Sequence, residues 1–178
     1  NANSVVAISR VSAQPSFGFI NDDTSPTLIG FDLNIAATGE ETLTLTFDET
    51  VVSSSVAPAQ LALHALRPPV QLSETFIVGG DSSVSIFDSH ILTIELSLRN
   101  TNELKRLGLV AHNAQTSLLS LTSQLLVDMN NNAIVAIPSQ TSVRVSTYIR
   151  DSTAPTFLNF SLNLNTNSTT ATLTLDFD

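Results

Sequence analysis

A segment near the start of the chain returns 129 residues later, and this internal repeat limits the fold more than any other feature. Residues 22–34 read DDTSPTLIGFDLN and residues 151–163 read DSTAPTFLNFSLN, with seven of thirteen positions identical. After one inserted residue, the segment 42–48 (TLTLTFD) returns as 172–178 (TLTLDFD). Repetition at a fixed period is typical of arrays of structural units, which serve as scaffolds, stalks or filaments.

The repeat divides the chain into three parts. Residues 3–8 (NSVVAI) also match a segment 129 residues later, NAIVAI. We therefore expect residues 1–21 to hold the last strands of one unit, residues 22–150 a complete unit, and residues 151–178 the first strands of another. A unit of this length can bury its own core. The partial units predict either an excerpt of a longer array or strand donation between copies.

Composition excludes several classes of protein. Seven basic residues against sixteen acidic ones give a net charge of −9, and such a chain repels phosphate backbones, so we expect no nucleic-acid partner. No apolar run approaches the roughly 20 residues of a membrane span, and no signal peptide is recognised. Cysteine is absent, while serine and threonine number 44 of 178 residues. The hydroxyl-rich surface favours an extracellular or cell-surface location.

Alternating apolar and polar residues predict strands with one buried face. The predicted inward positions are Ile29, Phe31, Leu33 and Ile35, then Leu43, Leu45 and Phe47, then Leu92, Ile94, Leu96 and Leu98. Further strands are predicted at 60–66, 74–78, 84–87, 117–122, 133–137 and 143–149. Eight or nine short strands in one unit indicate an all-β fold, an antiparallel β-sandwich.

One short helical crossover interrupts the strands. We expect it at 102–107, with Asn100 or Thr101 as its cap and Gly108 closing it.

The run Leu43-Thr-Leu-Thr-Phe-Asp-Glu-Thr-Val51 follows an Asp-x-x-x-Pro motif and precedes an Asp128-x-x-x-Asn132 turn. In these marks the unit resembles the bacterial Ig-like repeats of surface-layer proteins and large adhesins. The resemblance implies Ig-like sandwiches strung in tandem on a secreted chain, with a structural or adhesive role.

No arrangement of residues typical of an enzyme is present. A hydrolase needs a nucleophile, a base and a group that orients the base, but the chain has no Gly-x-Ser-x-Gly motif. Its three histidines, His64, His90 and His112, are scattered, and we expect them at the surface or in turns. The sequence therefore predicts no catalytic residues and no catalysis.

Oxygen ligands at the ends of the unit make calcium a candidate cofactor, because Ca²⁺ takes six to eight oxygens. The candidates lie at the unit boundaries and in one polar turn: Asp22, Asp23, Asp128, Asn130, Asn132 and Asp151. A calcium ion there would fix the angle between units. Asp and Asn also favour turns by bonding their own backbone, which explains the same residues without a metal.

Two Asn-x-Ser/Thr motifs predict N-glycosylation, at Asn159 and Asn167. Asn159 falls on the outward phase of its predicted strand, where the earlier unit has Gly30. Covalent glycans are therefore expected on the surface.

Together these features favour a structural repeat of an extracellular filament, stalk or surface adhesin, whose partners are neighbouring repeats or copies of itself. The alternative is a carbohydrate- or cell-recognition module carried on a surface stalk, with the loops 52–58 and 66–73 as its contact surface. The alternative lacks exposed aromatic residues typical of sugar binding, since the chain has no tryptophan and one tyrosine.

Overall fold

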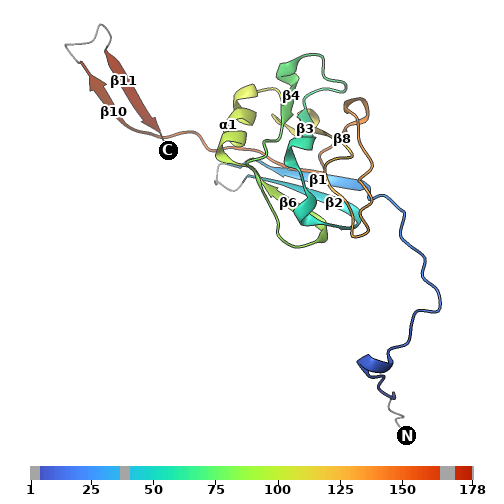
Figure 1. Ribbon diagram of the computed structural model, residues 1–178. Coiled ribbons are helices and arrows are strands. Elements are labelled where there is room, and N and C mark those ends of the chain that lie inside the picture. The colour runs from blue at the N-terminus through green and yellow to red at the C-terminus, as the bar shows by residue number, and fades with distance from the viewer. Residues whose placement is uncertain (1–4, 37–40, 165–170, 178) are drawn as a thin grey trace.

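The protein is described by a computed structural model that covers residues 5–36, 41–164 and 171–177 (Figure 1). The strands are β1 (Leu28–Asn34), β2 (Thr42–Val51), β3 (Leu61–His64), β4 (Thr75–Ile77), β5 (Ser83–Val84), β6 (Ser89–Glu95), β7 (Leu118–Leu121), β8 (Val143–Arg144), β9 (Thr147–Ile149), β10 (Phe157–Asn163) and β11 (Thr172–Phe177). The α-helix is α1 (Leu98–Leu107), and 3₁₀ turns lie at Arg10–Ser12, Ser53–Ser55, Pro58–Gln60, Leu72–Glu74, Ala114–Thr116 and Ser139–Thr141. The described chain is thus mostly β.

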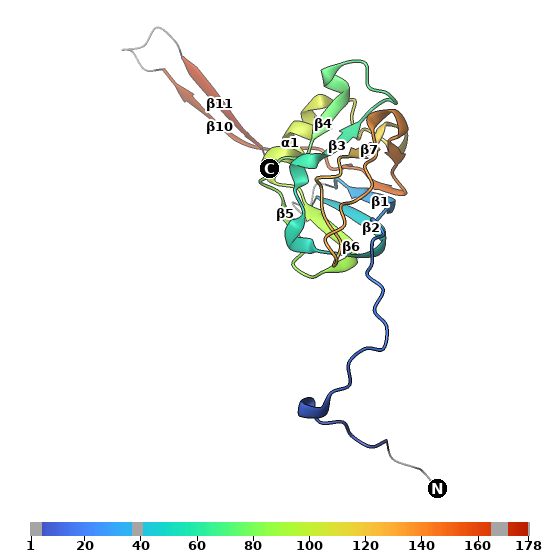
Figure 2. The same cartoon turned by 45° about the vertical axis from the view of Figure 1, so that its right-hand side comes forward.

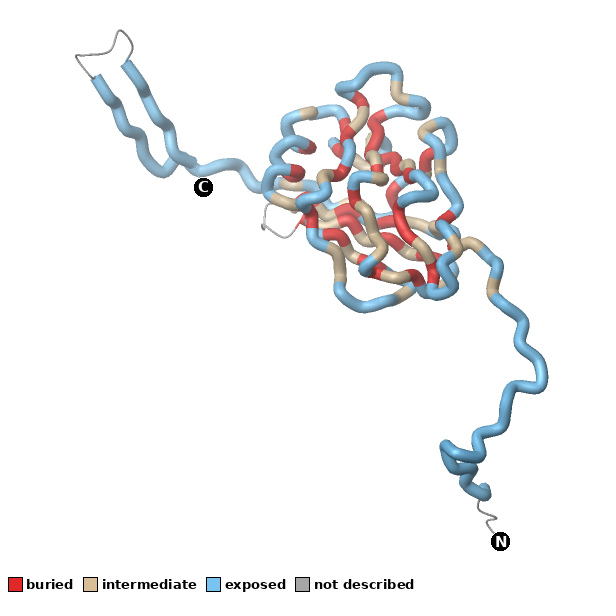
Figure 3. The backbone as a smooth tube through the Cα atoms, viewed as in Figure 1, coloured by how far each residue is buried: buried red, intermediate tan, exposed pale blue. Residues whose placement is uncertain are grey.

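Strands β1–β9 form two sheets, which with α1 make up what we call the two-sheet body. One sheet has the order β5-β6-β2-β1-β9 and the other β4-β3-β7-β8. Alternating residues of both sheets enter a single buried cluster, in which Phe31, Leu45 and Leu63 are at most 1% exposed. Figure 3 shows this buried layer inside the body. The arrangement is compatible with the predicted β-sandwich.

The inward phase of β1 fails at one predicted position. Phe31, Leu33 and Ile35 are buried, but Ile29 is 64% exposed. The register of β1 against β2 shifts between Leu28 and Gly30, so the strand carries a β-bulge there. A bulge inserts an extra residue into one strand, which turns Ile29 out of the alternation.

The first and last strands of the body pair in parallel, contrary to the prediction of an antiparallel sandwich. β1 and β9 run side by side with Leu33 opposite Tyr148, and the amide of Ile35 donates to the carbonyl of Ile149 over 2.9 Å. Since both strands run the same way, the chain arrives at one end of the body and leaves at the other. We call these ends the N-terminal pole and the C-terminal pole (Figures 1 and 2).

The predicted crossover helix is present but begins earlier than expected. α1 starts at Leu98, and the side chain of Ser97 caps it by accepting the amide of Asn100 over 3.2 Å. Asn100 is a buried residue inside the helix, where its Oδ1 accepts the amide of Gly79 over 2.8 Å. Leu98, predicted as an inward strand position, is therefore an exposed helix residue. Gly108 closes the helix in the left-handed conformation, as predicted.

Two predicted strands are divided or absent. The segment 143–149 splits into β8 and β9, which belong to different sheets, because the chain crosses between the layers at Val145 and Ser146. The segment 133–137 forms only isolated bridges, through Ala133 and Ile137. A period of two cannot tell a crossing or a bridge from a continuous strand.

Beyond the C-terminal pole, β10 and β11 form a separate hairpin, the terminal hairpin. Its register repeats that of β1 and β2 pair for pair: Leu162 faces Leu173 as Leu33 faces Leu43, and a shift follows Phe157 as one follows Leu28. Its apolar residues are half exposed or more. In Figure 3 the hairpin is coloured as exposed along its described length. The terminal hairpin therefore pairs as β1 and β2 do, but no opposing sheet packs on its apolar face in the described residues.

The segment before the body is also exposed along its length. Val5, Ile8, Phe17 and Ile20 are each at least 64% exposed. In the part of the chain that is described, no helix is both long and apolar enough to cross a membrane.

The repeat supplies a matched pair of substitutions, Phe31→Ala and Phe160→Ala. Phe31 is 1% exposed and its counterpart Phe160 is 63% exposed. We expect Phe31→Ala to lower the free energy of unfolding of the body by about 3–5 kcal/mol, through lost burial and a cavity. Phe160→Ala should change it by less than about 0.5 kcal/mol. Urea denaturation followed by the fluorescence of Tyr148 measures both free energies. Equal losses of stability in the two variants would contradict the burial of Phe31 and the exposure of Phe160.

Candidate functional site

Three carboxylates meet at the N-terminal pole, and we call them the acidic cluster: Asp22, Glu49 and Asp128. One carboxylate oxygen from each lies within 4.8 Å of the others. Asp128 is buried, while Asp22 and Glu49 are partly exposed. Three carboxylates supply part of the oxygen set that Ca²⁺ takes.

The polar turn after Leu126 holds Asp128 in place. Its Oδ1 accepts the amides of Asn130 and Asn132 over 2.9 and 2.7 Å. The Asn132 side-chain amide donates to Asp128 Oδ2 over 2.8 Å and to the carbonyl of Asp22 over 3.1 Å. Through Asn132, the turn thus connects Asp128 to Asp22, which lies in the segment that precedes β1.

Glu49 was missed by the sequence analysis. It lies in β2, which is buried at Phe47 and Val51, so alternation places Glu49 on the inward side. A carboxylate at an inward strand position was the available signal.

Like charges surround Glu49. The pKa of Glu49 is raised above its ordinary value, first by burial and then by the negative charges of Asp22, Asp128 and Asp48. Asp128 differs: burial alone would raise its pKa, but hydrogen bonds from Asn132, Asn130 and Asn131 bring it below the ordinary value. The cluster therefore favours one proton or one cation near Glu49.

The other predicted metal ligands lie outside the acidic cluster. Asp23 is exposed beside it, and Asn130 contributes its backbone amide to Asp128. Asn132 directs its side-chain nitrogen at the Asp128 carboxylate and at the backbone carbonyl of Asp22, so it supports the cluster and offers it no oxygen. Asp151 lies at the C-terminal pole, where it pairs with Lys105 over 2.9 Å. Of the six predicted residues, Asp22 and Asp128 share a cluster.

The glycosylation candidates differ in what can be said of them. Asn167 lies outside the described residues. Asn159 is exposed in β10, and its Nδ2, the atom that carries an N-glycan, donates to Asp176 Oδ2 over 3.1 Å. Its counterpart Gly30 has less room, because a Cβ there would lie 2.9 Å from Ser146 Oγ. Glycosylation of both residues stays a prediction.

His64 corrects the expectation of a surface histidine. It is 4% exposed, because its ring is enclosed between two neighbouring strands. Its Nε2 lies 2.7 Å from Ser120 Oγ and its Nδ1 3.1 Å from Thr75 Oγ1. Burial lowers the pKa of His64. Hydroxyls on both sides satisfy the neutral ring, so this histidine joins β3 to β4 and β7.

A hollow of about 710 Å³ lies between β4 and α1. Leu72 and Ser73 from the predicted recognition loop border it, together with Arg99 and Arg106 of the helix. Among its lining residues the aromatic one is Phe76, which is 4% exposed. The hollow therefore offers no stacking surface for a sugar ring.

Calcium should relieve the repulsion in the acidic cluster. We expect millimolar Ca²⁺ to raise the Tm of the chain at neutral pH, and Glu49→Gln to raise the Tm without calcium and to remove the calcium response. Without calcium, the stability that protonated Glu49 contributes is present below its ordinary pKa of 4.5 and is lost as pH rises through the raised pKa of the folded state.

Differential scanning calorimetry in EDTA and in Ca²⁺ measures these effects. Asp23→Asn is the matched control, because it removes a neighbouring carboxylate outside the cluster and should leave the response intact. A Tm that changes neither with calcium nor with Glu49→Gln would contradict the repulsion between the three carboxylates of the cluster.

Comparisons with protein-family models, curated proteins and solved structures find no match for this chain. The distinctive features of its geometry are the two poles of the body, the terminal hairpin and the acidic cluster.

Proposed function

We propose that the chain is a structural repeat of an extracellular filament, stalk or surface adhesin, built from Ig-like sandwiches in tandem. The terminal hairpin carries the proposal. It follows the body directly and has the strand pairing of β1 and β2, including the bulge. A second unit that begins in this way, 129 residues after the first, is what an array requires.

The direction of the strands supports the same proposal. Because β1 and β9 are parallel, the segments before and after the body leave from opposite poles. Units joined through opposite poles extend in a line, whereas units joined through a single pole fold back on themselves. The seven residues of β1 span about 23 Å at 3.3 Å per residue, so each unit adds reach to a stalk.

The outer surface fits a secreted fibre. Threonines occupy the outward positions of β2, where Thr44 Oγ1 lies 3.5 Å from Thr93 Oγ1 of β6. Hydroxyls make the surface polar with few charges, and Asn159 presents an exposed amide for a glycan. In this proposal the partners are neighbouring repeats or copies of the chain, and no catalysis is involved.

Electron microscopy of the native material tests the proposal. We expect fibres or stalks with domain-sized beads at a regular spacing, in the extracellular or cell-surface fraction. Intact mass distinguishes an array on one chain from a fibre of copies joined by strand donation, because a species near 19.0 kDa indicates separate copies. Isolated monomers in the cytoplasm would contradict the proposal.

A further inference from the structure

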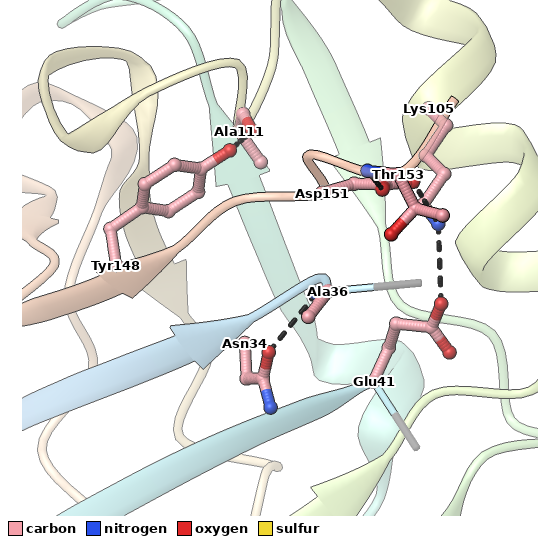
Figure 4. A network of polar contacts seen from close by, with 8 residues as sticks. All are labelled: Asn34, Ala36, Glu41, Lys105, Ala111, Tyr148, Asp151 and Thr153. Carbon is pink, nitrogen blue, oxygen red and sulfur yellow. Dashed lines mark hydrogen bonds and ion pairs between the residues drawn. The ribbon is translucent and has the colours of Figure 1, made fainter. Parts of the chain in front are cut away.

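The C-terminal pole holds the chain's one lysine, Lys105, in contact with the segment that leaves the body. Its Nζ lies 2.9 Å from Asp151 Oδ2 and 3.2 Å from Glu41 Oε1. Figure 4 shows the ammonium group of α1 directed at Glu41 and Asp151. The lysine thus joins the helix, the start of β2 and the first residue of the next predicted unit.

Asp151 uses its two oxygens for different purposes. Oδ1 accepts the amide of Thr153 over 2.9 Å, which fixes the turn that begins the next unit. Its repeat counterpart Asp22 does the same, accepting the amide of Thr24 over 3.0 Å. The turn is therefore common to both units, and Asp151 Oδ2 remains for the lysine.

We propose that each joint between consecutive units is held by a lysine of the preceding unit, which binds the first aspartate of the following unit. In this chain the pair is Lys105 and Asp151. This inference rests on the proposed tandem array and adds to it a specific contact that fixes the angle at the joint.

Burial and charge at the C-terminal pole suit this role. The Glu41 side chain is 7% exposed, so the core end of the bridge is anchored, while Lys105 and Asp151 remain about one third exposed or less. Burial alone would lower the pKa of Lys105, but the two carboxylates raise it above the ordinary value. The pKa of Asp151 is lowered by the Thr153 amide and by Lys105. Both partners are therefore charged at neutral pH.

The helix explains why this contact belongs to the joint. α1 ends at Leu107, and Gly108 turns the chain away, so Lys105 lies in the last turn beside the outgoing segment. The neighbouring cation Arg106 pairs with Glu103 of the same helix over 2.7 Å and does not reach the joint. Of these two adjacent cations, Lys105 thus binds the outgoing segment and Arg106 pairs within the helix.

The other end of the body has carboxylates to which such a contact could be made. Asp22, the counterpart of Asp151, lies among Glu49 and Asp128. In an array, an ammonium group from a preceding unit would approach Asp22 and bring a positive charge to a place where three carboxylates lie together. The N-terminal pole therefore offers negative charge to an ammonium group of a preceding unit.

Electron–electron distance measurement between two spin labels tests the proposal on the full chain. The chain has no cysteine, so cysteines placed at the exposed positions Ser123 and Ser161 label the body and the terminal hairpin alone. We expect Lys105→Gln to broaden the distance distribution about twofold, since the ion pair no longer limits rotation at the joint. Raising the salt to about 1 M should broaden it too, because the Debye length falls to about 3 Å.

Three variants separate the contact from general effects on the fold. Arg106→Gln removes the neighbouring cation and should leave the distribution unchanged. Asp151→Asn keeps an oxygen for the Thr153 amide but loses the charge, so it should broaden the distribution as Lys105→Gln does. Circular dichroism checks that each variant is folded.

A distance distribution that is equally wide in the wild type and in Lys105→Gln would overturn the proposal that the contact between Lys105 and Asp151 holds the joint. That result would leave the tandem array standing, because imaging tests the array separately. If imaging finds no beaded fibre while the distribution responds to Lys105 and not to Arg106, the array fails and the contact holds within this chain.

Discussion

The contact between the inward faces of the two sheets is the interaction on which the rest of the structure depends. β1 and β2 pair in one register, and β10 and β11 pair in the same register, yet only the first hairpin lies in a core. Pairing within each hairpin is thus the same, but β1 and β2 are also flanked by β9 and β6 and are covered by the opposing sheet. An isolated two-stranded hairpin is at best marginally stable in water, so the flanking strands and the opposing sheet supply most of the stabilisation of β1 and β2.

The parallel pairing of β1 with β9 converts this core into a unit that can be strung in a line. It sends the chain out at the pole opposite to its arrival. Each pole then carries charged groups beside the joint: the acidic cluster at one, and Lys105 with Glu41 at the other. In the proposed array, the core, the strand direction and the charges at the poles act at successive levels: the first holds a unit together, the second aligns units, and the third fixes their angle.

Much of the fold was predictable from the alternation of apolar and polar residues along the strands. Phe31, Leu33 and Leu45 are buried as the alternation predicts, and the repeat anticipated the terminal hairpin. Ile29 was not predictable, because a bulge is a property of a strand pair. The burial of His64 was not predictable either, since one hydroxyl that satisfies its ring comes from Ser120, in a strand distant in sequence.

The candidate sites were predicted less completely, because residues far apart in the sequence form them. Asp22 and Asp128 were expected, while Glu49 and the Lys105 contact appear only once the strands are assembled. Amide hydrogen exchange of the purified chain tests most directly whether register alone, without flanking strands and an opposing sheet, stabilises a hairpin. The account predicts strong protection of amides in β1 and β2 and exchange close to the unprotected rate in β10 and β11. Equal protection of the two hairpins would contradict it.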